Sequence, residues 1–293
     1  AVADQQRLAE RLMHAVGFPP EHGRLDTSRH PFSSGTPEDL RITTRYDEGD
    51  FTSAIMAVLH ETGHALYDHG LPRAWRHQPV GEALGMSIHE SQSLIVEMQA
   101  CRSRAFMAFA APLMREAFAG EGEAWEPENL YRLQTRVAPS LIRVEADEVT
   151  YPLHILLRTR LERLLIAGEL EAGDLPGAWA EGMREGLGIT PPDDRDGCLQ
   201  DIHWVEGIFG YFPTYTLGAV TAAQLYQAAR RDEPELETAL GEGDFRPLLG
   251  WLAENVHSLA SSLDARALVV QASGKPLDAD DFEAHLRARY LAD

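Results

Sequence analysis

The chain has 293 residues, of which 44% are hydrophobic and 25% are charged, proportions typical of a packed globular protein rather than a disordered chain. Its 26 basic and 46 acidic residues give a formal net charge of −20, which argues against nucleic acid or an anionic membrane as the main partner. Two cysteines are too few for a disulfide framework, and the N-terminal residues are too polar for a secretory signal. A cytoplasmic protein is expected, and the longest apolar stretch, 105–114, is too short to span a membrane.

Helical periodicity dominates the chain, and strand-like alternation is scarce. A helix is predicted over 1–16, then a loop over 21–38, then one strand over 39–46 that should be an edge strand or a hairpin arm. Further helices are predicted over 51–69, 83–110, 129–138, 141–167, 176–187, 202–231, 236–240, 246–256 and from 278 onward. Because no connection is long enough to be an interdomain linker, the sequence predicts a mostly α, single helical domain over residues 1–293 with a short β-strand or hairpin.

The sequence His60-Glu61-Thr62-Gly63-His64 lies inside the helix predicted over 51–69. Residues four apart share one helix face, so both imidazoles can reach a single ion while Glu61 lies beside them to accept a proton from water. This is the HExxH pattern of zinc hydrolases, although a polar helix face would produce the same letters. A catalytic zinc needs a third protein ligand, and Glu90 on the next predicted helix can supply it unless it is an ordinary solvated glutamate.

Six short motifs follow one another along the chain: His30-Pro31-Phe32, Asp39-Leu40-Arg41-Ile42-Thr43, the segment 60–64, His89-Glu90-Ser91, Ile142-Arg143 with Ala146-Asp147, and GCLQDIHW over 197–204. In this order they resemble the thermostable metallocarboxypeptidases of the carboxypeptidase Taq type, from residue 1 to the end of the chain. The resemblance implies a zincin-like helix and a broad-specificity enzyme that releases C-terminal amino acids from peptides with a free C-terminus. It also implies Zn²⁺, replaceable by Co²⁺ or another divalent ion, bound by His60, His64 and Glu90, with Glu61 as the general base.

A carboxypeptidase must hold a terminal carboxylate, and arginine does this best because its planar group forms paired, charge-assisted hydrogen bonds. Arg143 is the first candidate and Arg41 the second. Arg41 could instead form an ion pair with Asp39 or Asp147.

The tetrahedral intermediate needs a hydrogen-bond donor for its oxyanion, and His203, Tyr215 or Tyr211 can provide one, with Tyr211 also a candidate for substrate binding. Aromatic packing is the alternative role for the tyrosines. Gln200 is predicted to bind the substrate backbone, and Asp201 to orient a neighbour such as a metal-bound histidine.

Family members are longer than this chain, in which the first motif already begins at His30. An N-terminally shortened member is expected to have a wider cleft, slower turnover, and a homodimer interface near residues 1–16. After Ser93 the family's Arg-Leu-Trp-Glu-Asn is replaced by Leu94-Ile95-Val96-Glu97-Met98. Two rival functions remain: an endopeptidase or aminopeptidase, and a metal-binding regulatory homologue that has lost catalysis.

Overall fold

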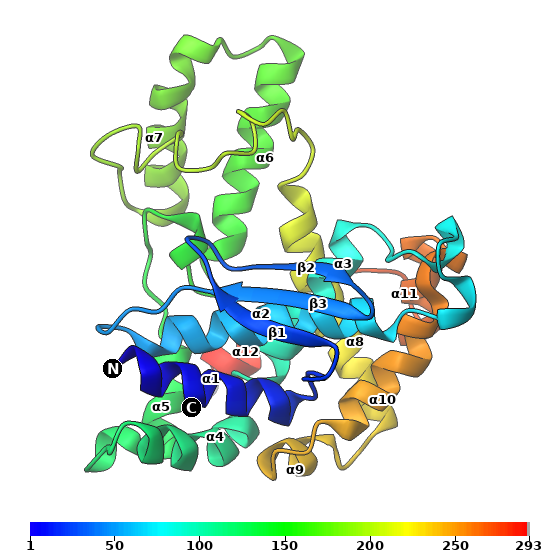
Figure 1. Ribbon diagram of the computed structural model, residues 1–293. Helices are drawn as coiled ribbons and strands as arrows, with labels where there is room; N and C mark the ends of the chain where they lie inside the picture. The colour runs from blue at the N-terminus through cyan, green and yellow to red at the C-terminus, as the bar shows by residue number, and fades with distance from the viewer. Residues whose placement is uncertain (292–293) are drawn as a thin grey trace. The chain divides into compact units, whose positions relative to one another are not determined.

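The computed structural model describes residues 1–291, which form twelve α-helices and one three-stranded sheet (Figure 1). The predicted mostly α class is therefore confirmed. The helices are α1 Val2–Val16, α2 Phe51–Gly70, α3 Met86–Leu94, α4 Arg104–Ala117, α5 Pro127–Gln134, α6 Tyr151–Ala167, α7 Leu175–Leu187, α8 Pro213–Asp232, α9 Leu236–Gly241, α10 Arg246–Asn255, α11 Ala265–Ser273 and α12 Asp280–Tyr290. The strands are β1 Gly23–Thr27, β2 Phe32–Thr36 and β3 Asp39–Thr44. Over the described range, none of the helices combines the length and apolarity needed to cross a membrane.

The chain divides into two compact units. The first unit contains residues 1–134 and the segment that starts at Gly218, and the second contains residues 135–217. In the second unit, α6 and α7 lie side by side (Figure 1) around a small core that includes Leu161, Trp179 and Met183. The predicted single catalytic domain over 1–293 stays a prediction, because compactness does not tell whether two units act together.

The predicted strand over 39–46 is confirmed as β3, but it is the central strand and not an edge. It pairs in parallel with β1 and antiparallel with β2, so the alternative of a hairpin arm holds for the β2–β3 pair. The loop predicted over 21–38 is wrong where β1 and β2 form. Neither strand contains a fully buried residue, and both lack the apolar alternation by which a strand is predicted.

The sheet positions the helix that carries the HExxH sequence. Leu40 and Ile42 of β3 are buried in a cluster with side chains of α1 and α2. Where β3 ends, the hydroxyl of Thr44 donates to the carbonyl of Ala54 in α2 at 3.3 Å. Asp50 is the cap residue directly before α2, and its carboxylate accepts from the backbone N–H groups of the first turn. These contacts fix the start of α2 relative to the end of β3.

The single helix predicted over 83–110 is wrong, because the chain forms α3, then the π-helix η3 over Ile95–Ala100, and then α4. α4 starts anew at Ser103, whose hydroxyl accepts from the N–H of Phe106 at 3.0 Å. From the sequence alone this cap cannot be told apart from a serine inside one longer helix, since serine also occurs inside helices.

Two other predicted helices begin later than expected. The helix predicted over 141–167 starts at Tyr151, after Asp147 has accepted from the N–H groups of Val149 and Thr150. The helix predicted over 202–231 starts at Pro213, after a turn-rich stretch in which Gly210 has a φ of 78°. Helix α11, which follows the cap residue Asp264, was not predicted.

The apolar face of α1 is already covered within the chain. Leu8, Leu12 and Val16 are at most 2% exposed and belong to the main hydrophobic core. The homodimer contact predicted near residues 1–16 would therefore use the polar face of α1, and it stays a prediction.

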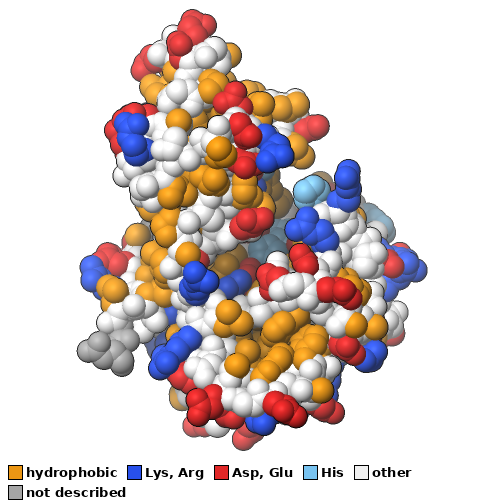
Figure 2. Space-filling model, turned by 90° about the vertical axis from the view of Figure 1, so that its left-hand side faces the viewer, with side chains coloured by type: hydrophobic (Ala, Val, Ile, Leu, Met, Phe, Trp, Pro, Cys, Tyr) orange, Lys and Arg blue, Asp and Glu red, His pale blue; other side chains and the backbone are white. Residues whose placement is uncertain are grey.

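On the face of the molecule shown in Figure 2, basic side chains occur in scattered groups among acidic and hydrophobic ones.

Candidate metal centre

The HExxH helix α2 and the helix α3 approach each other closely because Gly63 has no side chain. A Cβ added at Gly63 would lie 2.6 Å from both the carbonyl oxygen of Gln92 and the Cα of Ser93. Likewise, a Cβ at Gly218 of α8 would lie 2.7 Å from Cγ of Glu90. Two glycines thus let α2 and α8 converge on the part of α3 that carries Glu90.

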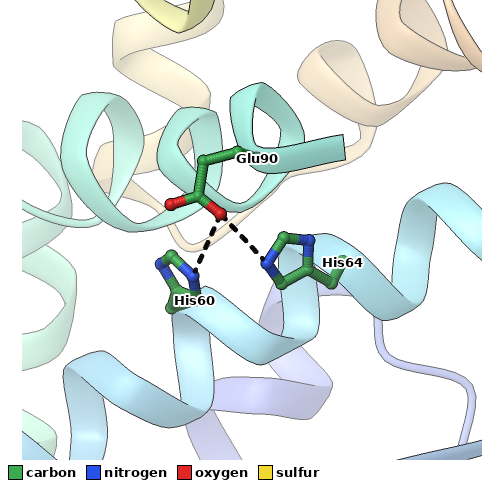
Figure 3. Close-up of side chains that lie close together, drawn as sticks. All are labelled: His60, His64 and Glu90. Carbon is green, nitrogen blue, oxygen red and sulfur yellow. Dashed lines mark ion pairs between the residues drawn. The ribbon is translucent and has the colours of Figure 1, made fainter. Parts of the chain in front are cut away.

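His60 and His64 of α2 and Glu90 of α3 bring one ligand atom each to within 4.8 Å of one another. Figure 3 shows the Glu90 carboxylate pointing from its helix toward both imidazoles. Its Oε2 lies 3.9 Å from Nε2 of His60 and 3.5 Å from Nε2 of His64. Two imidazole nitrogens and one carboxylate oxygen are a typical donor set for a divalent ion such as zinc, so these residues fit the metal that the sequence predicts.

The other ring nitrogen of each histidine is also engaged. Nδ1 of His60 lies 2.9 Å from Oε2 of Glu97, whose Oε1 accepts from Arg102 at 2.7 Å. Nδ1 of His64 lies 2.6 Å from Nδ1 of His89, and Nε2 of His89 lies 3.1 Å from Oδ1 of Asp68. Both histidines therefore direct Nε2 toward Glu90.

Sequence reasoning missed Glu97, Asp68 and the role of His89. The neighbours that Asp201 is seen to hold are Arg143 and Arg158. Helical spacing contained a signal, because Asp68 follows His64 by four residues and Glu97 follows Glu90 by seven. That spacing indicates a shared helix face but not which imidazole each carboxylate reaches.

Burial and neighbouring charges shift the pKa values of the ionisable side chains at the candidate metal centre. Burial raises the pKa of Glu61 to about 7, which suits a group that accepts a proton near neutrality. For His60, burial opposes the charged form, but the carboxylates of Glu90 and Glu97 outweigh it and raise the pKa to about 10. Such a concentration of acidic groups around two histidines favours a cation.

A second buried polar cluster lies within residues 135–217 and is centred on Asp201. Its Oδ1 accepts from Nε of Arg143 at 2.9 Å, and its Oδ2 accepts from Nε of Arg158 at 2.6 Å. Oε1 of Gln200 accepts from the backbone N–H of Arg143 and from Nη2 of Arg158, both at 2.8 Å. Arg143 also donates from Nη1 to the hydroxyl of Tyr151 at 2.7 Å. Two arginines share one carboxylate, so the cluster has an excess of positive charge.

Arg158, which the sequence reasoning missed, is the most deeply buried member of this cluster. Its side chain is 0% exposed and its guanidinium lies 4.5 Å from the ring centroid of Trp179. Burial lowers the pKa of Arg158 to about 10, against the opposing effect of Asp201. The position of Arg158 in the sequence gave no indication of this role, because nothing in a single sequence distinguishes Arg158 from the other arginines of α6.

The aromatic residues predicted to act on the oxyanion, His203, Tyr211 and Tyr215, lie together in the same unit. Nε2 of His203 is 3.0 Å from the hydroxyl of Tyr215, and the rings of Tyr211 and Tyr215 are 5.4 Å apart between centroids. Burial lowers the pKa of His203, which favours the neutral imidazole. The Arg143 guanidinium lies 4.9 Å from the ring centroid of Tyr215.

Arg41 lies in the other unit, on β3, where it pairs with Asp39 at 2.7 Å between Nε and Oδ1. Of the two ion-pair partners considered for Arg41, the structure thus has Asp39, while Asp147 accepts hydrogen bonds within residues 138–150. The substrate-binding roles of Arg41, Arg143, Gln200 and Tyr211 stay predictions, as do the catalytic roles of His203 and Tyr215.

Sequence and structure comparisons agree on the relatives of this chain. A model of the family described as carboxypeptidase Taq (M32) metallopeptidase matches residues 1–290. Thermostable carboxypeptidase 1 of Thermus thermophilus is 46% identical over 292 residues, which are 99% of this chain and 57% of that protein. Carboxypeptidase 1 of Bacillus subtilis is 38% identical over 290 residues, again 99% of this chain but 56% of the relative.

Solved structures give the same result. Metallocarboxypeptidase 1 of Trypanosoma cruzi superposes with a TM-score of 0.96 at 42% identity, covering 100% of this chain and 61% of that one. The M32 carboxypeptidase from Deinococcus radiodurans R1 superposes with a TM-score of 0.95 at 40% identity, covering 99% and 59%. The chain thus spans a little over half the length of these relatives. With a match over nearly all of its residues and the HExxH helix facing Glu90, the chain belongs to the carboxypeptidase Taq (M32) family of metallopeptidases.

Proposed function

We propose that the protein is a zinc-dependent carboxypeptidase that releases single amino acids from the C-termini of peptides, with broad side-chain specificity. The observation that carries the proposal is the donor set of His60, His64 and Glu90 with the buried Glu61 next to His60 in the sequence. His60, His64 and Glu90 would hold the ion, which when bound supplies a Lewis acid for the scissile carbonyl and lowers the pKa of water.

Glu61 is the proposed general base. Its carboxylate accepts a proton from the attacking water, while the water oxygen forms a bond to the scissile carbonyl carbon. The same proton then passes from Glu61 to the leaving nitrogen as the C–N bond breaks, which releases a free amino acid and a shortened peptide. A pKa of about 7 allows Glu61 both to accept and to return the proton near neutral pH.

Arg143 is the proposed partner of the terminal carboxylate. Its Nε and Nη2 are held by Asp201, and its Nη1 donates to Tyr151, so the guanidinium plane is fixed before substrate binds. A fixed guanidinium loses less conformational entropy when it binds a carboxylate than an exposed one does, which favours Arg143 over Arg41. His203 and Tyr215 are proposed as oxyanion donors and Gln200 and Tyr211 as contacts of the substrate backbone.

One set of peptides tests this function and its rivals. We expect amino acid release from a pentapeptide with a free C-terminus, none from its C-terminal amide, and undiminished release when the N-terminus is acetylated. Cleavage of the amide at the same rate would indicate an endopeptidase or aminopeptidase, and acetylation would separate those two. A protein that binds zinc stoichiometrically but cleaves none of these peptides would be the regulatory homologue.

The Glu61→Gln variant tests the base. The amide preserves the shape of the side chain but cannot accept the proton, so we expect bound zinc to be unchanged and turnover to be lost almost completely. Glu116→Gln, on an exposed side chain that pairs with Arg11, is the matched control and should behave as the unmodified protein. Near-normal turnover of Glu61→Gln would show that another group is the base.

A further inference from the structure

The two metal-binding histidines predicted in α2 have different partners on their outward nitrogens. Nδ1 of His60 contacts the carboxylate of Glu97 directly, at 2.9 Å. Nδ1 of His64 contacts His89 at 2.6 Å, and only beyond His89 is there a carboxylate, that of Asp68 at 3.1 Å. In each case the chain of hydrogen bonds ends on an acidic group.

These contacts determine which ring nitrogen carries the proton. A carboxylate only accepts hydrogen bonds, so Nδ1 of His60 keeps its proton against Glu97, and Nε2 is the nitrogen that would give up its proton and offer a lone pair to an ion. Asp68 likewise requires the proton of His89 to lie on Nε2, so Nδ1 of His89 accepts from the protonated Nδ1 of His64. In both imidazoles Nδ1 is thus occupied by an outer partner, which leaves Nε2 as the nitrogen available to an ion, and Nε2 is the atom that faces Glu90 in each.

Glu97 is held rigidly in its position. It is 7% exposed and lies in the π-helix η3, a rare wide helical turn of the kind often found at functional sites. Arg102 donates from Nη2 to its second oxygen at 2.7 Å and from Nη1 to the carbonyl of Gln134 at 2.7 Å. Because Arg102 is itself anchored, Glu97 cannot turn away from His60 without leaving a buried charge unpaired.

Asp68 differs from Glu97 in its exposure, so the two chains of hydrogen bonds, one from His60 to Glu97 and one from His64 through His89 to Asp68, can be tested separately. Its side chain is 27% exposed, and it lies one turn after His64 on the same helix. His89, which lies between His64 and Asp68, is the neighbour of Glu90 on α3, so this chain of hydrogen bonds connects α2 to α3.

We propose that Glu97 is a positioning residue for His60 and that Asp68, acting through His89, is a positioning residue for His64. Neither touches substrate or the reacting atoms. Each holds one imidazole with Nε2 directed at the ion, and the inference rests on the metal site of the proposed function. Outer partners of metal-binding histidines typically contribute about 10- to 100-fold to metal affinity.

The test measures metal affinity rather than peptide cleavage. Zn²⁺ dissociation constants would be determined by competition with a chromophoric chelator for the unmodified protein, Glu97→Gln and Asp68→Asn. Both variants preserve side-chain size while removing the charge that requires the proton on the facing nitrogen. Matched controls are Glu116→Gln and Asp26→Asn, both at exposed ion pairs.

We expect each positioning variant to bind Zn²⁺ at least 10-fold more weakly and the controls to stay within about twofold of the unmodified protein. The Co²⁺-loaded variants should also show altered visible absorption bands, since the ligand geometry changes. The chelator-treated Asp68→Asn variant should unfold at nearly the same temperature as the unmodified protein, because the side chain is partly exposed. A purely structural role would change that temperature and leave the absorption bands of the folded protein unchanged.

A folded Glu97→Gln or Asp68→Asn protein that binds Zn²⁺ as tightly as the unmodified protein would overturn the positioning role of the residue replaced. If Glu97→Gln does not fold, Glu97→Asp keeps the charge but shortens the side chain and withdraws the carboxylate from His60, and unmodified affinity there would overturn the assignment of Glu97. Failure of the unmodified protein to bind Zn²⁺ would overturn the metal site itself. Absence of peptide cleavage, with metal affinities as expected, would leave the inference standing and refute only the proposed function.

Discussion

Gly63 lies between the two histidines of the HExxH sequence, and its replacement by alanine should separate α2 from α3. The added Cβ would lie 2.6 Å from the carbonyl oxygen of Gln92 and from Cα of Ser93, whereas ordinary contacts begin at 3.4 Å. Both atoms belong to the backbone, so neither can rotate away. The helices must move apart by the difference of 0.8 Å at this point.

Two opposing effects determine the stability of Gly63→Ala. Alanine in place of glycine inside a helix stabilises by about 0.5–1 kcal/mol. Overpacking in a closely packed region costs about 1–3 kcal/mol. We therefore expect a net destabilisation of about 1–2 kcal/mol. Metal binding should suffer more, because Glu90 moves with α3 and metal–ligand distances are satisfied only within about 0.2 Å.

Urea unfolding after chelator treatment and Zn²⁺ affinity by competition would measure the two effects separately. Gly250→Ala is the matched control, since Gly250 lies in the middle of α10 and a Cβ there would meet nothing within 4 Å. The control should be slightly more stable than the unmodified protein and should bind Zn²⁺ equally well. A Gly63→Ala protein with the behaviour of the control would refute the reasoning that the α2–α3 distance sets the ligand geometry.

Two other predictions concern buried ionisable groups that are not proposed metal ligands. His257 is 4% exposed, and burial lowers its pKa to about 3. The unfolded chain therefore takes up a proton below about pH 6.5 that the folded chain does not, so stability falls as the pH drops from there toward 3. At pH 4.5 this amounts to about 3 kcal/mol. In urea unfolding of the chelator-treated protein at pH 7.5 and 4.5, His257→Gln should lose much less stability on acidification, and an identical loss would contradict the assignment. Asp201→Asn should leave Arg143 and Arg158 without their shared carboxylate and destabilise residues 135–217 by about 3–5 kcal/mol. Tryptophan fluorescence during urea unfolding would measure this, with the exposed Asp39→Asn as a nearly neutral control, and a change below about 1 kcal/mol would rule out a structural role for the cluster.

Much of the helical fold and the shared face of His60 and His64 could be predicted from the sequence because both depend on spacing along one helix. His60 and His64 lie one turn apart in any α-helix, so their shared face follows from four residues of separation alone. The helix from Val2 to Val16 and the helix from Phe51 to Gly70 were predicted nearly to the residue for the same reason. Strand β3 was recognised by its alternation, whereas β1 and β2 gain their hydrogen bonds only from pairing with it.

Contacts between distant segments were decided by the tertiary structure. The distance between Glu90 and the two histidines depends on how closely α2 and α3 pack, which Gly63 permits but does not by itself dictate. That Glu97 meets His60, and that Asp201 pairs with Arg158, depends on side-chain direction and on which helices become neighbours. A single sequence specifies local periodicity through backbone geometry, but the pairing of buried charges is selected by the cost of leaving any of them unpaired, and that cost exists only once the chain has folded.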